Sequence, residues 1–148
     1  LNMKKRRDSI LIACTNLILP IITTLGLYII LHGHLSPGGG FQGGVLIAGA
    51  FAIVFIGYGN KKIKKEKKAK CFKVLEDIGA LGFILLAFLG LLSGSAFFTN
   101  TISNGVAGDL FSSGSIVLMN FCVGFKVFAG ISFLLMVLMM TLKKGDEE

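Results

Sequence analysis

Long apolar runs separated by short polar segments dominate the pattern of this chain. The runs cover residues 10–31, 41–59, 78–98 and 116–142. A helix needs about 20 apolar residues to cross the hydrocarbon core of a bilayer, and lipid offers no water to satisfy an exposed backbone. The pattern therefore predicts an all-α integral membrane protein, with four transmembrane helices in a single domain over residues 1–148.

The basic residues predict how these helices are oriented. Fourteen of the 15 Lys and Arg residues lie before the first run, between the second and third runs, or after the fourth run. The other two connections contain none. Because cytoplasmic segments carry the excess of Lys and Arg, both termini are predicted to lie in the cytoplasm.

The composition agrees with a membrane chain and excludes other classes. Hydrophobic residues make up 53% of the sequence, and the net charge is +7. The basic residues lie directly beside apolar runs, so we expect no nucleic acid among the partners. The lysine-rich segment 61–73 is instead predicted to be a solvated loop near anionic lipid headgroups, with an acidic partner subunit as the alternative. Three cysteines without a CxxC pair predict buried thiols, not a disulfide framework or a metal cluster.

Acidic residues mark two of the predicted helix starts. Asp8 and Ser9 are N-cap candidates for the first run. Glu76 and Asp77 stand where we expect the third helix to begin, and a helix dipole favours negative charge there. Capping and compensation of the lysine charge is the favoured interpretation. The alternative is a site where ions are taken up from the cytoplasm.

Small residues predict close packing of the helices. Glycines four residues apart occur in three pairs, which are Gly39 and Gly43, Gly40 and Gly44, and Gly90 and Gly94. Such spacings let helix backbones approach each other in lipid. In the first run, Asn16, Thr23 and Thr24 lie on roughly one side, with Pro20 among them, and we expect these polar groups to face protein. The pattern does not tell whether the partner helix belongs to this chain.

Lys126 is the one basic residue inside an apolar run. A lysine in hydrocarbon is costly unless it is paired or hydrated, so it is a functional candidate. It is roughly 16 Å from Ser115 and 24 Å from Leu142 along a helix, and two interpretations stay open: snorkelling or structural pairing, and a place on an ion path. The apolar runs offer no acid, so its partner is expected from another subunit or from water. Cys122, Lys126 and Gly130 share one face, which we expect to face protein.

Other polar residues lie at the opposite ends of the runs. His32 and His34 follow the first run, but two histidines without a third ligand favour a polar interface position over a metal site. Asp109 is the one acid of the third connection, and a plain loop position is favoured over a cation uptake site. The candidate ion-path residues are therefore Lys126, His34, Asp109, Glu76 and Asp77.

A glycine-rich segment over residues 34–44 is the most unusual stretch of the sequence. It lacks the Lys-Ser or Lys-Thr of a phosphate-binding loop, and no strand precedes it as in a dinucleotide fold. We expect a tight turn leading into a glycine-lined helix. Its role is either packing against neighbours or lining an ion passage with unwound backbone. The candidate packing residues are Pro37, Gly38, Gly39, Gly40, Phe41, Gly43 and Gly44.

This segment resembles the signature of the B-subunit family of multisubunit Na⁺/H⁺ antiporters, the Mnh/Mrp type. The resemblance rests on Gly33-His34 followed by residues 37–44, and residues 120–127 also resemble the last helix of that family. It implies a small, non-catalytic membrane subunit of a prokaryotic plasma membrane. The partners would be other Mrp-type membrane subunits and the lipid bilayer, with Na⁺ and H⁺ as transported ions and no cofactor in this chain.

Two alternatives remain open at this point. The same family includes subunits of Mrp-derived membrane-bound hydrogenases and sulfur-reducing respiratory complexes. Because the chain has no iron–sulfur, haem or flavin ligand set, redox chemistry there would belong to other subunits. A stand-alone homo-oligomeric channel or membrane scaffold is the alternative from a different class.

Overall fold

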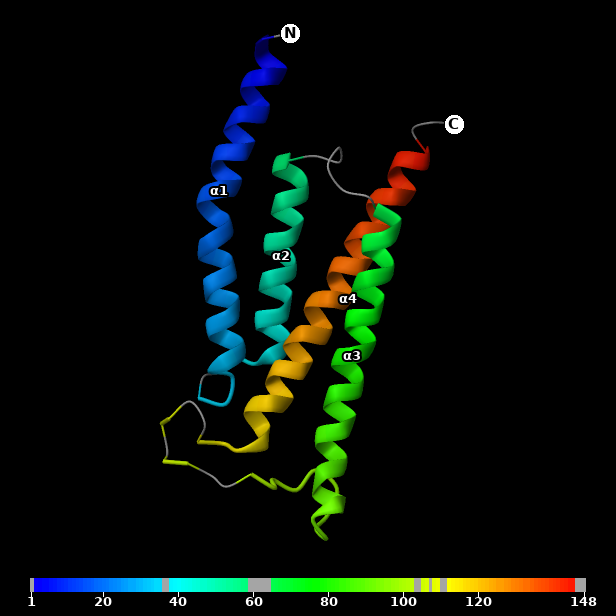
Figure 1. The fold of residues 1–148 in the computed structure, drawn as a ribbon. Helices are drawn as coiled ribbons and strands as arrows, with labels where there is room; N and C mark the ends of the chain where they lie inside the picture. Colours follow the sequence, from blue (N-terminus) through cyan, green and yellow to red (C-terminus); the bar gives the residue numbers. More distant parts are fainter. Residues whose placement is uncertain are drawn as a thin grey trace.

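Four helices make up the regular structure within the described residues of this computed structural model of the protein (Figure 1). It describes residues 2–35, 38–58, 65–102, 105–106, 108–109 and 112–145. The helices are α1 (Asn2–Leu31), α2 (Gly40–Tyr58), α3 (Lys65–Leu92) and α4 (Ser115–Gly145). Each contains a segment long and apolar enough to cross a membrane, at Ser9–Leu31, Gly40–Tyr58, Ala69–Leu92 and Ser115–Thr141. The predicted all-α membrane class is confirmed.

The third membrane segment differs from its predicted range of 78–98, because α3 ends at Leu92. The amide of Gly94 donates to the Leu91 carbonyl (3.0 Å), and that of Ser95 donates to the Gly90 carbonyl (3.1 Å). With Gly94 at a φ of 77°, these are the two bonds of a Schellman motif, which closes a helix at a left-handed residue. Gly94 therefore ends α3, and the predicted pairing of Gly90 with Gly94 on one helix face is wrong.

The apolar residues after Gly94 turn back onto α3 instead of extending it. The Phe98 amide donates to the Ala87 carbonyl (3.2 Å), and the Phe97 ring packs on Phe88 with centroids 5.3 Å apart. Hydropathy alone could not distinguish this return from a longer helix, because the apolar residues are the same in both arrangements.

The starts of α1 and α3 also lie earlier than predicted. Asp8 and Ser9 are inside α1 and do not cap it. α3 begins at Lys65, so the lysine-rich segment is helical from that residue, and Glu76 and Asp77 lie well inside the helix. The prediction that they sit at a helix N-terminus is wrong. Lys and Glu are good helix formers, which allows the helix to continue beyond the apolar run.

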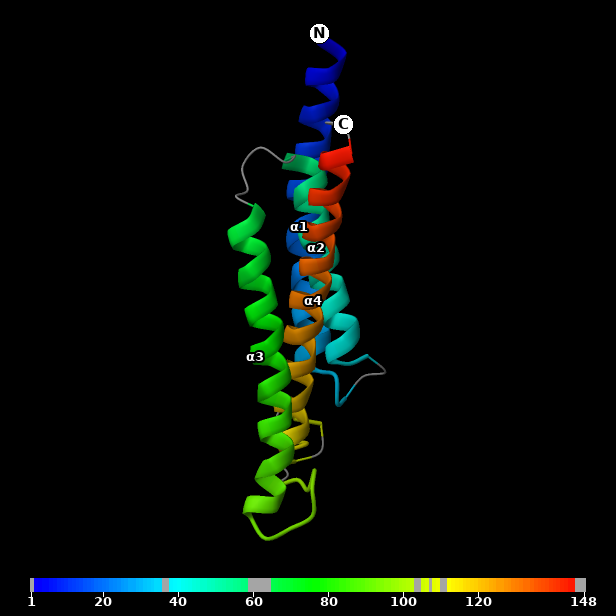
Figure 2. The ribbon, with the colours of Figure 1, turned by 90° about the vertical axis from the view of Figure 1, so that its right-hand side faces the viewer.

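The four helices form an open row and not a closed bundle. α1 packs on α2, α2 packs on α4, and α4 packs on α3. Within the described part of the chain, the backbones of α1 and α3 do not approach each other. Seen from the side, α1, α2 and α4 line up behind one another while α3 stands apart (Figure 2). Many large apolar side chains of the four helices are therefore exposed.

One apolar cluster ties α2, α3 and α4 together. Phe55, Ala69 and Met136 are buried in it, and the rings of Phe51 and Phe72 meet with centroids 5.0 Å apart. This cluster lies toward the end of the molecule where α1 begins and α4 finishes (Figure 1). α2 also finishes and α3 begins there, and the basic segments of these helices share this end, which we call the basic end.

Candidate functional site

The glycine-rich segment lies at the junction of α1, α2 and α4. A β-carbon placed on Gly43 would lie 2.5 Å from Ile30 of α1, and one on Gly44 would lie 2.5 Å from the Gly124 carbonyl of α4. A β-carbon on Gly40 would collide with the Asn120 carbonyl. Since these backbones leave no room for a side chain, the glycines serve packing within this chain.

The remaining residues of this segment have different positions. The Gly39 amide donates to the Gln42 side chain (2.8 Å), which caps the start of α2. Gly38 and Gly39 directly precede α2 and are half-buried. Phe41 is 62% exposed and faces away from the glycine contacts. Pro37 lies outside the described residues.

Some polar and cysteine side chains of α1 and α3 contact other helices of this chain, and others are exposed. Asn16 accepts a hydrogen bond from the Tyr58 hydroxyl of α2 (2.5 Å), so its predicted contact with protein is confirmed. Thr24 and Pro20 line a shallow depression on the outer face of α1, so they do not face protein within this chain. Cys14 and Cys71 are exposed, contrary to the prediction of buried thiols.

α4 packs against α3 in an antiparallel register that is set by small residues. A β-carbon on Gly79 would lie 3.0 Å from Lys126, and one on Gly82 would lie 3.1 Å from the Cys122 sulfur. A β-carbon on Gly130 would lie 3.5 Å from the carboxyl carbon of Glu76. Cys122 and Gly130 face α3, as predicted for this strip, whereas Lys126 contacts α3 through its backbone and β-carbon and has an exposed side chain.

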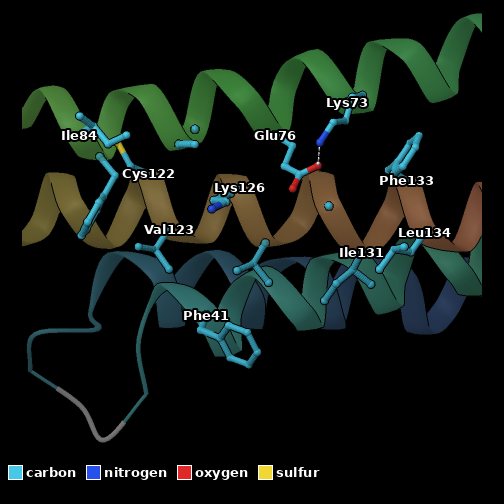
Figure 3. A pocket seen from close by; sticks show the side chains of 15 residues that line it. Phe41, Lys73, Glu76, Ile84, Cys122, Val123, Lys126, Ile131, Phe133 and Leu134 are labelled. Carbon is cyan, nitrogen blue, oxygen red and sulfur yellow. Dashed lines mark hydrogen bonds and ion pairs between the residues drawn. The ribbon is translucent and has the colours of Figure 1, made fainter.

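Between α3 and α4 lies a groove of about 790 Å³, whose rim includes Phe41 of α2. Figure 3 shows Lys73 and Glu76 reaching toward it from α3, and Lys126 lying on α4. The other lining residues are apolar or small, namely Gly79, Ala80, Phe83, Ile84, Cys122, Val123, Val127, Gly130, Ile131, Phe133 and Leu134. Three charged side chains thus share a largely apolar groove.

Glu76 is the central charge of this groove. Its carboxylate accepts a hydrogen bond from the Lys73 ammonium (3.1 Å) and is a quarter exposed. Lys73 also pairs with Asp77 (3.7 Å), which is 62% exposed and does not line the groove. The expectation that Lys126 has no acid within the membrane segments of this chain is therefore wrong. Glu76 lies inside the α3 segment, which begins at Ala69.

Lys126 lies near the middle of its membrane segment. It is two residues from the centre of Ser115–Thr141, which is about 3 Å along the helix axis. A charged lysine at this depth costs about 3 kcal/mol or more unless water or a counter-charge reaches it. Among the described residues, no ion pair joins Lys126 to an acid, and its side chain is exposed in the groove.

His34 and Asp109 come together at the opposite end of the row. The His34 Nε2 atom lies 3.4 Å from the Asp109 backbone oxygen. His32 stacks on Tyr28, with ring centroids 4.1 Å apart. No group of three His, Cys, Asp or Glu side chains within the described ranges could hold a metal ion. The five candidate ion-path residues thus separate into Glu76 with Lys126, His34 with Asp109, and the outward-facing Asp77.

Lys73 is a functional candidate that the sequence did not single out. Its spacing of three and four residues from Glu76 and Asp77 places all three on one side of a helix. That signal was hidden because the segment up to residue 73 was predicted to be a loop.

Comparison with known proteins identifies the family to which this chain is similar. The model of the domain related to the MnhB subunit of Na⁺/H⁺ antiporters matches residues 10–133. An uncharacterized protein of Methanocaldococcus jannaschii is 39% identical over 119 residues, which cover 76% of this chain and 45% of the relative. A Staphylococcus aureus (strain Newman) protein named as an antiporter subunit, mnhB2, is 32% identical over 93 residues, covering 63% of this chain and 65% of the relative.

A solved structure is similar over most of the chain. It is a chain in the structure of the membrane-bound sulfane sulfur reductase, an archaeal respiratory membrane complex, with a TM-score of 0.70 and 31% identity. The similarity covers 84% of this chain and 55% of that chain. The matched region therefore spans from 45% to 65% of the length of these relatives. The four apolar helices and the matching domain identify this chain as a multi-pass protein of the prokaryotic plasma membrane. It belongs to the family of domains related to the MnhB subunit of Na⁺/H⁺ antiporters.

Proposed function

We propose that the chain is a small, non-catalytic membrane subunit of a multisubunit Na⁺/H⁺ antiporter. The observation that carries this proposal is Lys126, a charged residue at mid-membrane in a groove that its own chain leaves open. A lone chain would expose this lysine to lipid, whereas a neighbouring subunit can cover the groove and supply water or a counter-charge. The family supports the same assignment.

The arrangement of the helices supports a role for this chain within an assembly. An open row leaves large apolar side chains uncovered on α1, α3 and α4, and other membrane subunits are the proposed partners beside the lipid. The basic end is proposed to face the cytoplasm, because Lys and Arg accumulate on that side of membrane proteins. Na⁺ and H⁺ are the proposed transported ions, and the chain itself is proposed to hold no cofactor.

A second candidate is the same subunit within a redox-driven ion pump. It is favoured by the similarity to a chain of an archaeal respiratory membrane complex. In that setting the electron-transfer groups would belong to other subunits, and this chain would keep its role in the ion path and in subunit contacts.

Purification in mild detergent from the native host, followed by mass spectrometry of the co-purifying proteins, tests the proposal. Large antiporter-like subunits without redox subunits are the expected result. Additional iron–sulfur or nickel–iron subunits would place the chain in a respiratory complex. Recovery of this chain alone, as a discrete oligomer, would overturn both assignments in favour of a channel or scaffold.

A further inference from the structure

We propose that Glu76 is a proton-relay carboxylate that exchanges its partner between Lys73 and Lys126 within the α3–α4 groove. The relay connects the basic end of the molecule to the middle of the membrane. This inference rests on the proposed function, which it deepens by assigning the groove to protons and not to sodium ions.

Glu76 and Lys126 are within reach of each other. The Glu76 carboxyl carbon lies 3.5 Å from the position of a β-carbon on Gly130. Lys126 is four residues before Gly130 on the same strip of α4, and β-carbons at this spacing are about 5–6 Å apart. A lysine side chain that turns along the helix covers that distance. Glycine at position 130 has no side chain that could stand between the carboxylate and α4.

The structure shows the carboxylate in one of two positions. It is bonded to Lys73 at 3.1 Å, on the side of the groove toward the basic end, as Figure 3 illustrates. In the second position it turns toward Lys126. Both lysines line the groove with Glu76 between them in the helix register, so each competes for the same carboxylate.

The charges of the groove favour protons over sodium ions. The titratable groups that line it are Lys73 and Glu76 from α3, and Lys126 and Cys122 from α4, while α2 contributes only Phe41. Two ammonium groups face a single carboxylate, which leaves no net negative charge to replace the hydration shell of a bound cation. A carboxyl group and an amine can instead pass a proton between them, because either group can act as proton donor or acceptor to a positioned partner.

The proposed step moves one proton and conserves charge. Glu76 takes a proton from water at the basic end and becomes a neutral carboxylic acid, which releases Lys73. It then turns toward Lys126 and replaces a proton that the Lys126 ammonium has passed to its next acceptor, which restores a carboxylate–ammonium pair. Beyond Lys126 the described lining residues are apolar apart from Cys122. The next acceptor is therefore a base or water held by the subunit that covers the groove.

Glu76→Gln and Asp77→Asn in the complete complex form a matched pair of variants for the test. Both substitutions remove one carboxylate beside Lys73, but Asp77 lies outside the groove and is 62% exposed. After reconstitution into proteoliposomes, proton flux driven by a Na⁺ gradient is expected to fall on the order of tenfold or more in Glu76→Gln. The flux should stay near the wild-type value in Asp77→Asn, and the KM for Na⁺ should be unchanged in both variants.

A double-mutant comparison tests the exchange with Lys126. If the two residues act as a pair, the flux of Glu76→Gln/Lys126→Gln is expected to match that of the slower single variant, without a further multiplicative loss. If Glu76→Gln prevents assembly, Glu76→Asp takes its place, since it keeps the acid but shortens its reach, and a loss of about threefold or more is expected.

The outcomes separate the relay from the proposed function. Equal flux in Glu76→Gln and Asp77→Asn would overturn the relay while leaving the antiporter assignment intact. A raised KM for Na⁺ in Glu76→Gln with unchanged maximal flux would also overturn it, in favour of a sodium site. A wild-type complex that exchanges no protons for Na⁺ would overturn the proposed function and the relay together.

Discussion

Lys126 is the leading functional candidate because it lies deep in the membrane segment of α4 and is exposed in the groove. A lysine near a helix end reaches the interface with its long side chain, but Lys126 is close to the centre of the α4 membrane segment. Snorkelling does not remove it from the membrane interior, so the groove must hydrate or pair it. The same groove contains Glu76, whose carboxylate is bonded to Lys73.

Lys126→Ala is expected to lower ion exchange by about tenfold or more while the complex still assembles. The substitution removes a charge from an open groove and creates no cavity in the packed core, so the fold should tolerate it. Exchange activity and subunit composition are measured on the same preparation. Phe125→Ala, next to it but outside the groove, is the control, and full activity of the assembled Lys126→Ala complex would remove Lys126 from the ion path.

The helices achieve their packing through backbone contact at glycines. α2 touches α1 through Gly43 and α4 through Gly44, and α3 touches α4 through Gly79. In lipid, where burial of apolar surface gives no driving force, such close approach provides much of the association energy. A side chain at these positions would push two helices apart, because the atoms it meets include backbone atoms of the neighbouring helix.

Gly44→Ala is expected to destabilise the protein by about 1–3 kcal/mol, since the new methyl group would overpack the α2–α4 contact. Reversible unfolding in mixed detergent measures the change. Gly49→Ala in the same helix is the matched control, because a β-carbon there meets nothing within 4 Å. It should leave stability unchanged or raise it by about 0.5–1 kcal/mol through a gain in helix propensity. Equal stability of both variants would contradict the packing role of Gly44.

At the scale of the whole molecule, the open row leaves both of its edge helices uncovered on one side. α4 lies at its centre and contacts all three other helices, while α1 and α3 form its two edges. Large apolar side chains remain exposed along these edges, among them Ile21 and Leu25 of α1 and Leu85 and Leu92 of α3. Lipid or neighbouring subunits must cover them.

The proposed orientation can be checked by cysteine labelling. In a variant without Cys14, Cys71 and Cys122, a cysteine replacing Ser95 is expected to react with a membrane-impermeant reagent in intact cells. Ser95 follows the end of α3 at Leu92, opposite to the basic end where α3 begins, and it is exposed. A cysteine replacing Lys70, near the basic end, should react only in inverted membrane vesicles. The reverse pattern would show that the basic end faces outward.

The sequence by itself determined the class, the number of membrane segments and the family. Each of these follows from local or additive properties: the length of the apolar runs and the glycine-rich segment over residues 34–44. It also predicted the strip of α4 that faces protein, because helical spacing places Cys122, Lys126 and Gly130 on one side.

The tertiary structure alone decided where the third helix begins and ends and which charged residues share a groove. Gly94 ends α3 by adopting a left-handed conformation, while the apolar residues after it fold back, and hydropathy is the same for both arrangements. Helix formation then continues from Lys65, which turns Glu76 from a terminal residue into one that faces α4. Glu76 and Lys126 are 50 positions apart in the sequence. Only the antiparallel register of α3 and α4 brings them into one groove, since that register depends on contacts between glycines and a distant helix.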